Sequence, residues 1–302
     1  MRNETEAREA AFAALAPERA ILGESPVWSA REGAIWWVDL DGRSLFRTVP
    51  GGETRRWPTP EMACFVQIRA DGAPVVGMES GLFAFDAASG RGGKIAPIPH
   101  EGVRFNDSCI DSAGRLWAGT MDPGNARPIG ALWLYGAEGA PERVLDGFLT
   151  INGLAWDAAR ERLYVSDSHP NVRKIWALEA PGGRPRPETR RLFADMAGLP
   201  GRPDGGAVDA EGCYWSAGVD GGELYRFAPD GALALRLRVP YEFPTKPAFG
   251  GPAHATMFLT SKADRGEGGR LAAAETGFRG LAAPEWRRAP ERAPKGRRAD
   301  EA

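Results

Sequence analysis

The sequence predicts an all-β fold, a six-bladed β-propeller, on the basis of three observations. From Ile21 onward the 302-residue chain consists of short apolar runs separated by Gly, Pro and Asp, with 39 Gly and 25 Pro in total. The runs come in pairs that recur about every 40–50 residues, a period typical of propeller blades and foreign to a β-sandwich. Six such units fit between Ile21 and Pro284. The positions that mark the period are Trp37, Val76, Trp117, Tyr164, Trp215 and Phe258.

Each unit is expected to hold an inner strand and a second strand after a turn. Neighbouring blades would bury each other's flat faces, which accounts for the many aromatic, Val and Leu positions. The paired runs are 34–39 with 44–47, 74–78 with 81–85, 115–119 with 131–135, 162–166 with 174–178, 213–216 with 223–227, and 257–260 with 269–272.

The two ends of the chain differ in composition from the repeats. Residues 1–16 are rich in Ala and Glu, and we expect an N-terminal extension that forms a short helix or stays disordered. Residues 17–284 are assigned to the propeller domain. The basic, Pro-containing segment 285–302 is expected to be a disordered tail.

Composition excludes several classes of partner. A formal net charge of -2 gives no electrostatic reason to expect nucleic acid or an anionic membrane surface. No apolar run approaches the ~18 residues of a membrane span, and the charged N-terminus lacks the apolar core of a signal peptide. Three cysteines (Cys64, Cys109 and Cys213) lie far apart, without a CxxC pair. We therefore expect a cytoplasmic protein, a monomer or weak homo-oligomer.

Common catalytic signatures are missing from the sequence. It contains no GxSxG, no HExxH, no Gly-rich phosphate loop and no GxGxxG ahead of a helix. The three histidines (His100, His169 and His254) fall in separate units without a nucleophile motif nearby. A Ser-His-Asp triad is therefore disfavoured.

Polar residues recur at one step of several units, just ahead of the predicted inner strands. Glu24, Asn106, Asn152 and Asp204 occupy this step. Taken singly, Asn-Gly and Asp-Gly are turn signals. Taken together, side chains at the same step of several blades would converge on the propeller axis. The two carboxylates and the amide of Glu24, Asn152 and Asp204 offer only oxygen ligands, which suit Ca²⁺, Mg²⁺ or Mn²⁺ and tolerate Zn²⁺.

The segment Arg104-Phe-Asn-Asp107 places a cation, an amide and a carboxylate within four residues. In an extended segment side chains alternate between faces, so Arg104 and Asn106 share one face and Asp107 takes the other. An arginine beside an asparagine makes a fork for a polyhydroxylated or carboxylated small molecule. A solvated strand end is the alternative interpretation of this segment.

Seven segments together carry a likeness to a known family. They are LGESPVW (22–28), RFND (104–107), the DxxGRLWAGTMD pattern (111–122), INGLAW (151–156), LYVSDS (163–168), RPDGGAVDAEG (202–212) and FGGP (249–252). As a set they resemble the regucalcin/senescence-marker/gluconolactonase family of six-bladed propellers. The resemblance implies one divalent cation held by Glu24, Asn152 and Asp204, and a sugar lactone bound near Arg104 and Asn106. It also implies that Asp122, which follows Thr120-Met121, contacts the substrate.

The chain departs from the family pattern at two places. Relatives commonly read NDGK or NDGR where this chain has Asn106-Asp-Ser-Cys109, so a basic residue is missing there. After 249–252 they commonly carry an acidic run, which is Ala253-His-Ala-Thr256 here. His254 is expected to be an exposed loop residue or a contact at the rim of the site. Both departures bear on the identity of the substrate more than on the cation.

The function that the resemblance implies is hydrolysis of an aldonolactone to the open aldonic acid. The cation would polarise the carbonyl, Asp204 would act as general base toward water, and Arg104 with Asn106 would hold the sugar hydroxyls. Asp107, turned away by strand alternation, would lie behind them. Two alternatives remain: a non-catalytic metal-binding regulatory or recognition propeller, and an esterase of the same fold with a different ester substrate.

Overall fold

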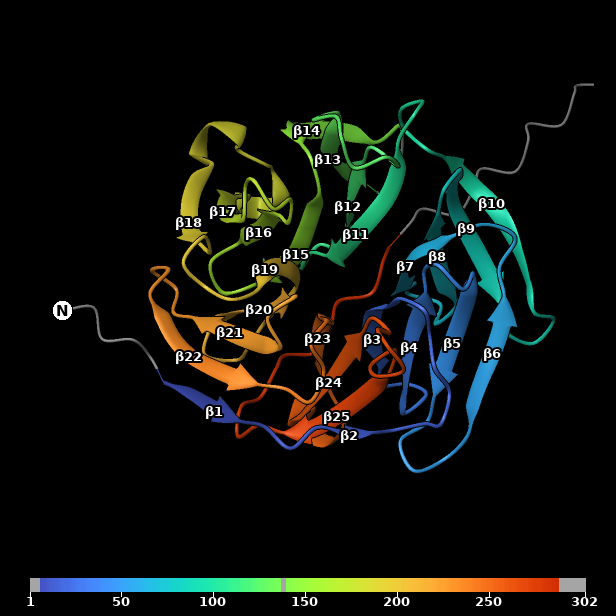
Figure 1. The fold of residues 1–302 in the computed structure, drawn as a ribbon. Coiled ribbons are helices and arrows are strands. Elements are labelled where there is room, and N and C mark those ends of the chain that lie inside the picture. Colours follow the sequence, from blue (N-terminus) through green and yellow to red (C-terminus); the bar gives the residue numbers. More distant parts are fainter. Residues whose placement is uncertain (1–5, 137–139, 288–302) are drawn as a thin grey trace, which may run out of the picture.

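The computed structural model describes residues 6–136 and 140–287 and consists of six β-sheets around a central channel (Figure 1). Each sheet is one blade, and consecutive blades lie side by side around the axis. The predicted all-β, six-bladed propeller is confirmed. Within the described residues the helical elements are short 3-10 turns, and no helix is long and apolar enough to cross a membrane.

Four strands of consecutive sequence form each of the first four blades, ordered from the channel outward. Blade 1 contains β3 (Gly23–Ser29), β4 (Ala34–Asp39), β5 (Ser44–Thr48) and β6 (Thr54–Pro58). Blade 2 contains β7 (Ala63–Ile68), β8 (Pro74–Met78), β9 (Gly81–Asp86) and β10 (Arg91–Pro97). Blade 3 contains β11 (Arg104–Ile110), β12 (Leu116–Met121), β13 (Gly130–Tyr135) and β14 (Glu142–Phe148). Blade 4 contains β15 (Ile151–Asp157), β16 (Arg162–Asp167), β17 (Lys174–Glu179) and β18 (Arg191–Asp195).

The last two blades borrow strands from the N-terminus. Blade 5 contains β19 (Arg202–Val208), β20 (Tyr214–Val219), β21 (Glu223–Phe227) and β22 (Leu233–Arg238), with β1 (Ala7–Glu9) paired parallel to β22. Blade 6 contains β23 (Pro244–Gly250), β24 (Thr256–Ser261) and β25 (Leu271–Glu275), and β2 (Ala13–Ala14) is its outermost strand. Within the described residues 6–16, the N-terminal segment forms two short strands and not the expected helix or disordered extension. Their pairing covers strand edges that would otherwise be open.

The predicted inner strands are in fact the second strands of the blades. The segment 34–39, for example, is β4, and the channel is lined by β3, which contains Glu24 itself. Apart from β7, the innermost strands are interrupted by Gly, Pro or polar residues, so they lack the continuous apolar run by which a strand is recognised in sequence. The polar residues at each unit's start consequently lie in the channel wall and not in loops ahead of it.

A β-bulge interrupts every innermost strand near its beginning. A bulge inserts extra residues on one strand and re-aims the side chains beside it. In blades 1, 3, 4 and 5 the polar residues Glu24, Asn106, Asn152 and Asp204 lie at or within this bulge. The register shifts lie between Glu24 and Val27, Ala63 and Phe65, Phe105 and Ser108, Asn152 and Ala155, Pro203 and Gly206, and Pro244 and Lys246.

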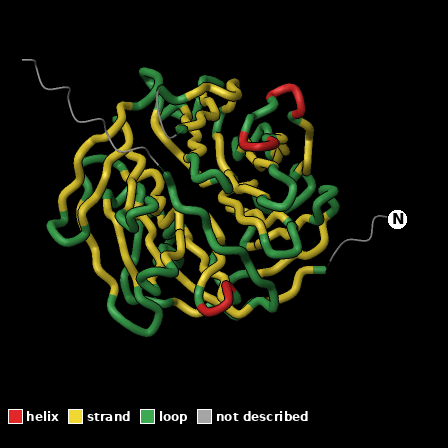
Figure 2. The backbone as a smooth tube through the Cα atoms, turned by 180° about the vertical axis from the view of Figure 1, so that it is seen from behind, coloured by secondary structure: helices red, strands yellow, loops and turns green. Residues whose placement is uncertain are grey.

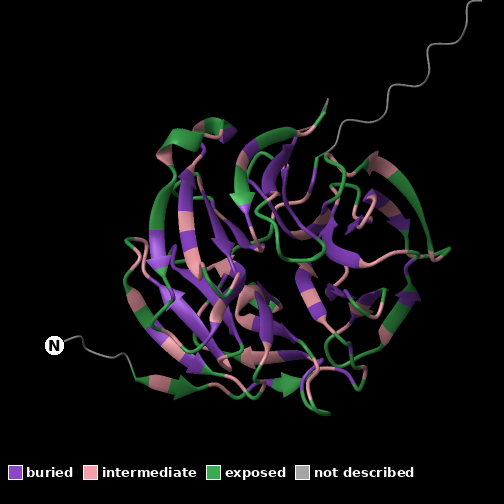
Figure 3. Cartoon of the chain, turned by 45° about the horizontal axis from the view of Figure 1, so that its top comes forward, coloured by how far each residue is buried: buried purple, intermediate pink, exposed green. Residues whose placement is uncertain are grey.

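The interior lies between blades, because the clusters of buried apolar side chains combine residues of neighbouring sheets. Figure 3 shows buried residues along many of the strands. The DxxG turns contribute to the interior through a buried aspartate. In blade 3 the Asp111 carboxylate accepts hydrogen bonds from the Ala113 and Arg115 amides and from Trp117 Nε1. Asp209 makes the equivalent contact with Trp215 Nε1 in blade 5. The turn and the core tryptophan are therefore fixed by one carboxylate.

The C-terminal segment crosses one end of the channel, from blade 6 toward blades 2 and 3 (Figure 2). Gly280 forms a bridge with Asp209, and Trp286, which is 2% exposed, forms one with Arg69. The Arg287 amide then donates to the Gly114 carbonyl. Residues 285–287 of the predicted tail are thus packed on the propeller, and the remainder, 288–302, lies outside the described residues.

Candidate active site

The structure brings Glu24, Asn152 and Asp204 together at the mouth of the channel opposite the C-terminal crossing. They come from β3, β15 and β19, each at the second or third residue of its strand. The Asn152 side-chain amide donates a hydrogen bond to Asp204 Oδ1. Asn152 and Asp204 are buried and Glu24 is half-buried. The convergence expected of these three residues is therefore present.

The two carboxylates are held in an environment that disfavours their charge. Burial, followed by the nearby charge of Asp107, raises the pKa of Glu24 from 4.5 to about 7. Burial, followed by the charge of Glu24, raises the pKa of Asp204 well above its usual range. Desolvation and like-charge repulsion both act in this direction. A cation placed between them would relieve both effects.

The donor chemistry fits a hard divalent cation. Glu24, Asn152 and Asp204 present carboxylate and amide oxygens, the ligands that Ca²⁺ and Mg²⁺ take in proteins. Among the described residues, no group of three or more His, Cys, Asp and Glu is arranged to hold a metal. A cation at this mouth would therefore have two carboxylates and one amide as its side-chain ligands, with its other positions open to water or substrate.

Asp107 faces the same cluster, and the expectation that strand alternation turns it away is wrong. The bulge of β11 lies between Phe105 and Ser108 and breaks the alternation. The Asp107 carboxylate is buried and accepts hydrogen bonds from the Ser108 amide at 2.7 Å and the Leu154 amide at 2.8 Å. Its charge contributes to the raised pKa values of Glu24 and Asp204.

Lys246 is a site residue that the sequence-based prediction missed. It lies in β23 of blade 6, and its ammonium forms a buried ion pair with Asp107 of blade 3, across the channel. It also donates to the Ser108 carbonyl at 3.2 Å. The one signal in the sequence is a lysine inside the otherwise uncharged run FPTKPAF.

Arg104 and Asn106 are paired, as the sequence predicts. Arg104 Nη1 donates to Asn106 Oδ1 and to the Phe105 carbonyl, both at 2.8 Å. Asn106 Nδ2 donates to the Ile151 carbonyl at 2.8 Å, one residue before Asn152. The charge of Arg104 also acts to lower the pKa of Glu24, against the effect of burial. The arginine–asparagine pair therefore lies beside the three convergent residues.

Asp122 organises the loop that follows β12. Its carboxylate accepts hydrogen bonds from the Ala126 and Arg127 amides and pairs with the Arg127 guanidinium at 2.7 Å. These bonds, led by that of the Arg127 side chain, hold the pKa of Asp122 below its usual range. Asn125 of the same loop contacts Thr150, immediately before β15. Direct contact between Asp122 and a substrate stays a prediction.

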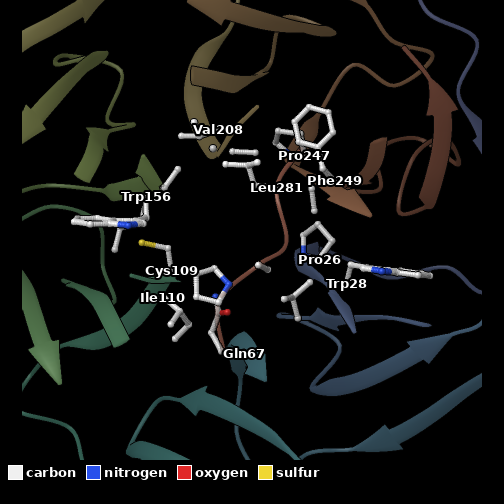
Figure 4. A pocket seen from close by; sticks show the side chains of 18 of the residues that line it. Pro26, Trp28, Gln67, Cys109, Ile110, Trp156, Val208, Pro247, Phe249 and Leu281 are labelled. Atoms are coloured by element: carbon white, nitrogen blue, oxygen red, sulfur yellow. The ribbon is translucent and has the colours of Figure 1, made fainter. Parts of the chain in front are cut away.

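The other half of the channel is an apolar pocket of about 160 Å³ (Figure 4). Trp28, Trp156, Phe249 and Leu281 line it, and Lys246 contributes to its polar lining. Residues 281–284 of the C-terminal segment form part of its wall. Lys246 thus stands between this pocket and the polar mouth.

The departure at 253–256 lies at the apolar end. His254 belongs to a 3-10 turn that follows the end of β23, and its carbonyl accepts from the Gly280 amide of the crossing segment. His254 is half-buried there. His254 therefore lies beside the crossing segment and away from the rim of the polar mouth.

Residues 22–263 match the family described as the SMP-30/Gluconolactonase/LRE-like region. The chain belongs to this family. It is 37% identical over 257 residues to a 6-deoxy-6-sulfogluconolactonase of Pseudomonas putida, a match covering 83% of this chain and 87% of the relative. It is 32% identical over 248 residues to a pentonolactonase of Haloferax volcanii, covering 82% and 84% of the two chains.

A solved family structure, the calcium-binding protein regucalcin of Agrobacterium tumefaciens, superimposes with a TM-score of 0.86 at 25% identity. The superposition covers 93% of this chain and 99% of the regucalcin. The ammonium of Lys246 reaches the Asp107–Ser108 segment from the opposite blade.

Proposed function

We propose that the protein is a metal-dependent hydrolase that opens a sugar lactone to the corresponding aldonic acid. The observation that carries the proposal is the convergence of Glu24, Asn152 and Asp204 at one channel mouth, beside the Arg104–Asn106 pair. A scaffold propeller has no need of an arginine–asparagine fork next to a cluster of carboxylates. The two relatives are both named as lactonases of sugar lactones, and these names support the same reaction class.

One divalent cation, Ca²⁺, Zn²⁺, Mn²⁺ or Mg²⁺, would be held by Glu24, Asn152 and Asp204. Such a cation supplies Lewis-acid polarisation of the lactone carbonyl and stabilises the oxyanion formed when water adds. The protein contributes a preformed donor set, since the Asn152–Asp204 contact already fixes two of the three side chains.

Asp204 is the proposed general base toward the attacking water. Burial and the charge of Glu24 raise its pKa, which makes its carboxylate a better proton acceptor. A ligand role acts in the opposite direction, because a neighbouring positive charge favours the ionised form. Its basicity in the working site is therefore set by the balance between burial and coordination.

Arg104 and Asn106 are the proposed substrate-orienting residues. The Arg104 guanidinium carries five N–H donors in a fixed plane, and its Nη1 is aligned by Asn106 Oδ1 and the Phe105 carbonyl. This anchoring limits the rotation of the guanidinium, so its other donors can meet sugar hydroxyls at low entropic cost. Asp122 contributes by shaping the 122–127 loop beside them.

The relatives' names, which describe a six-carbon sulfonated lactone and a pentonolactone, support a choice of substrate size. We propose a five- or six-carbon aldonolactone. The test is proton release on glucono-, galactono-, xylono- and arabinonolactone and on a 6-sulfonated gluconolactone. Each assay uses protein stripped with EDTA, before and after addition of Ca²⁺, Mn²⁺, Mg²⁺ or Zn²⁺.

Turnover restored by a cation and abolished in Asp204→Ala would support the proposal and name the substrate. Asp86→Ala is the control, since Asp86 is exposed at the end of β9 and should leave turnover unchanged. Cation binding without any turnover above spontaneous hydrolysis would overturn it in favour of a binding propeller.

A further inference from the structure

Lys246 lies in a buried position, where the free-energy cost of desolvating its ammonium calls for an explanation. Its side chain is buried, and it lies on the innermost strand of blade 6 between the polar mouth and the apolar pocket. Its ammonium pairs with Asp107 and donates to the Ser108 carbonyl on the opposite blade. Burial of an ammonium is tolerated only with such partners.

The path of the Lys246 side chain is built into the neighbouring blade. Gly205, directly after Asp204, packs against its aliphatic stem, and a Cβ there would clash with Cβ and Cγ and lie 2.8 Å from Cδ. The stem therefore crosses the backbone next to one proposed ligand. The head of the side chain then reaches Asp107, whose charge acts on the other proposed ligand, Glu24.

The acidic side chains of Glu24, Asp107 and Asp204 lie within electrostatic reach of one another at the mouth, where Arg104 acts on Glu24 and the Arg202–Asp220 ion pair lies near Asp204. We propose that Lys246 is a fixed counter-charge that cancels Asp107, so that Glu24 and Asp204 alone face the cation and set its affinity. This inference rests on the cation site of the proposed function. It assigns Lys246 a role in tuning affinity for divalent cations, outside the set of ligands.

If Lys246 has this role, removing Lys246 and removing Asp107 should change the cation affinity in opposite directions. Lys246→Met leaves an extra negative charge near the cation, so the affinity should rise by about tenfold or more. Asp107→Asn leaves the ammonium uncompensated, so the affinity should fall by about tenfold or more. The double variant removes one charge of each sign and should bind the cation within about threefold of wild type.

The experiment is isothermal titration calorimetry of Mn²⁺, and separately of Ca²⁺, into the full-length protein after EDTA treatment. The melting temperature without and with the cation is recorded on the same samples. Opposite shifts of the single variants and cancellation in the double variant would establish the counter-charge role. Equal affinities in all variants, or shifts of the same sign, would overturn it whatever happens to thermal stability.

Two further variants keep the test decisive if Lys246→Met does not fold. Lys246→Arg retains the charge and should keep the wild-type affinity to within about threefold. Cys109→Lys combined with Lys246→Met moves the ammonium to the other wall of the same pocket. This double variant should restore the wild-type affinity for the cation. If neither variant keeps the wild-type affinity for the cation, the proposal fails.

Lactone turnover on the same preparations separates this inference from the proposed function. Wild-type cation binding with the expected sign pattern but no turnover would overturn the lactonase proposal alone. Lactone turnover combined with the same cation affinity in all variants would overturn the role of Lys246 alone. Absence of cation binding by the wild type would overturn both.

Discussion

Glu24 makes the stability of the metal-free protein depend on pH in a direction opposite to that of an ordinary paired carboxylate. Burial and Asp107 raise the pKa of Glu24 from 4.5 to about 7 in the folded protein. Between these two values the folded state binds more protons than the unfolded state, so stability falls as pH rises. Below 4.5 the penalty is absent, and above 7 it is complete.

The size of the effect follows from the shift. One pKa unit corresponds to ~1.4 kcal/mol, so ionising Glu24 in the folded protein costs about 3 kcal/mol. The Glu24→Gln variant should therefore be about 3 kcal/mol more stable than wild type at pH 8 and similar to it below pH 4.5. The charge of Glu24 also raises the pKa of Asp204, so removing it relieves the ionised Asp204 as well. The gain in stability of Glu24→Gln at pH 8 should therefore be no smaller than this value.

The assay is urea denaturation of EDTA-treated protein at half-unit steps from pH 4.5 to pH 8.5. Glu53→Gln is the matched control, because Glu53 is exposed on the outer part of blade 1 and should give the wild-type curve. Parallel curves for wild type and Glu24→Gln would refute the reasoning. Saturating Mn²⁺ should reverse the order at pH 8, since only the wild type keeps the full set of ligands.

Three other predictions concern the frame of the site. Gly205→Ala should displace the Lys246 side chain and lower the free energy of unfolding by about 1–3 kcal/mol; Gly198→Ala, where no atom lies within 4 Å of the added Cβ, should have little effect in the same denaturation assay. Trp117→Phe should cost about 1–3 kcal/mol, because the buried carboxylate of its turn loses a donor, and an unchanged urea midpoint would contradict this. Deletion of residues 1–14 should open the edge of blade 6 and lower the melting temperature; a monomer of unaltered melting temperature by calorimetry and size exclusion would show that the added strands are dispensable.

Most of the fold could be predicted from the repeat period of the sequence. Paired runs with turn residues between them repeat every ~40–50 residues because each blade is one supersecondary unit that must bury its faces against the next. This local regularity fixed the number of blades and the order of the units. It misplaced the innermost strands, because Gly, Pro and polar residues interrupt the apolar positions of strands such as β3, β15 and β19.

The sequence also identified Glu24, Asn152 and Asp204 as a set, since equal position in successive repeats implies convergence on the axis. It could not place Asp107, because the alternation of side chains fails at a bulge, and a bulge is a property of the pairing between two strands. The pairing of Arg104 with Asn106 was accessible because it lies within one short segment.

Only the tertiary structure decided the partners that come from distant parts of the chain. Lys246 meets Asp107 over 139 residues of sequence because the ring places blade 6 opposite blade 3. Ala13 and Ala14 form the outer strand of the last blade because the ring must close on its own beginning. Local pattern determines what each blade is, whereas closure of the ring determines which charges and edges face one another.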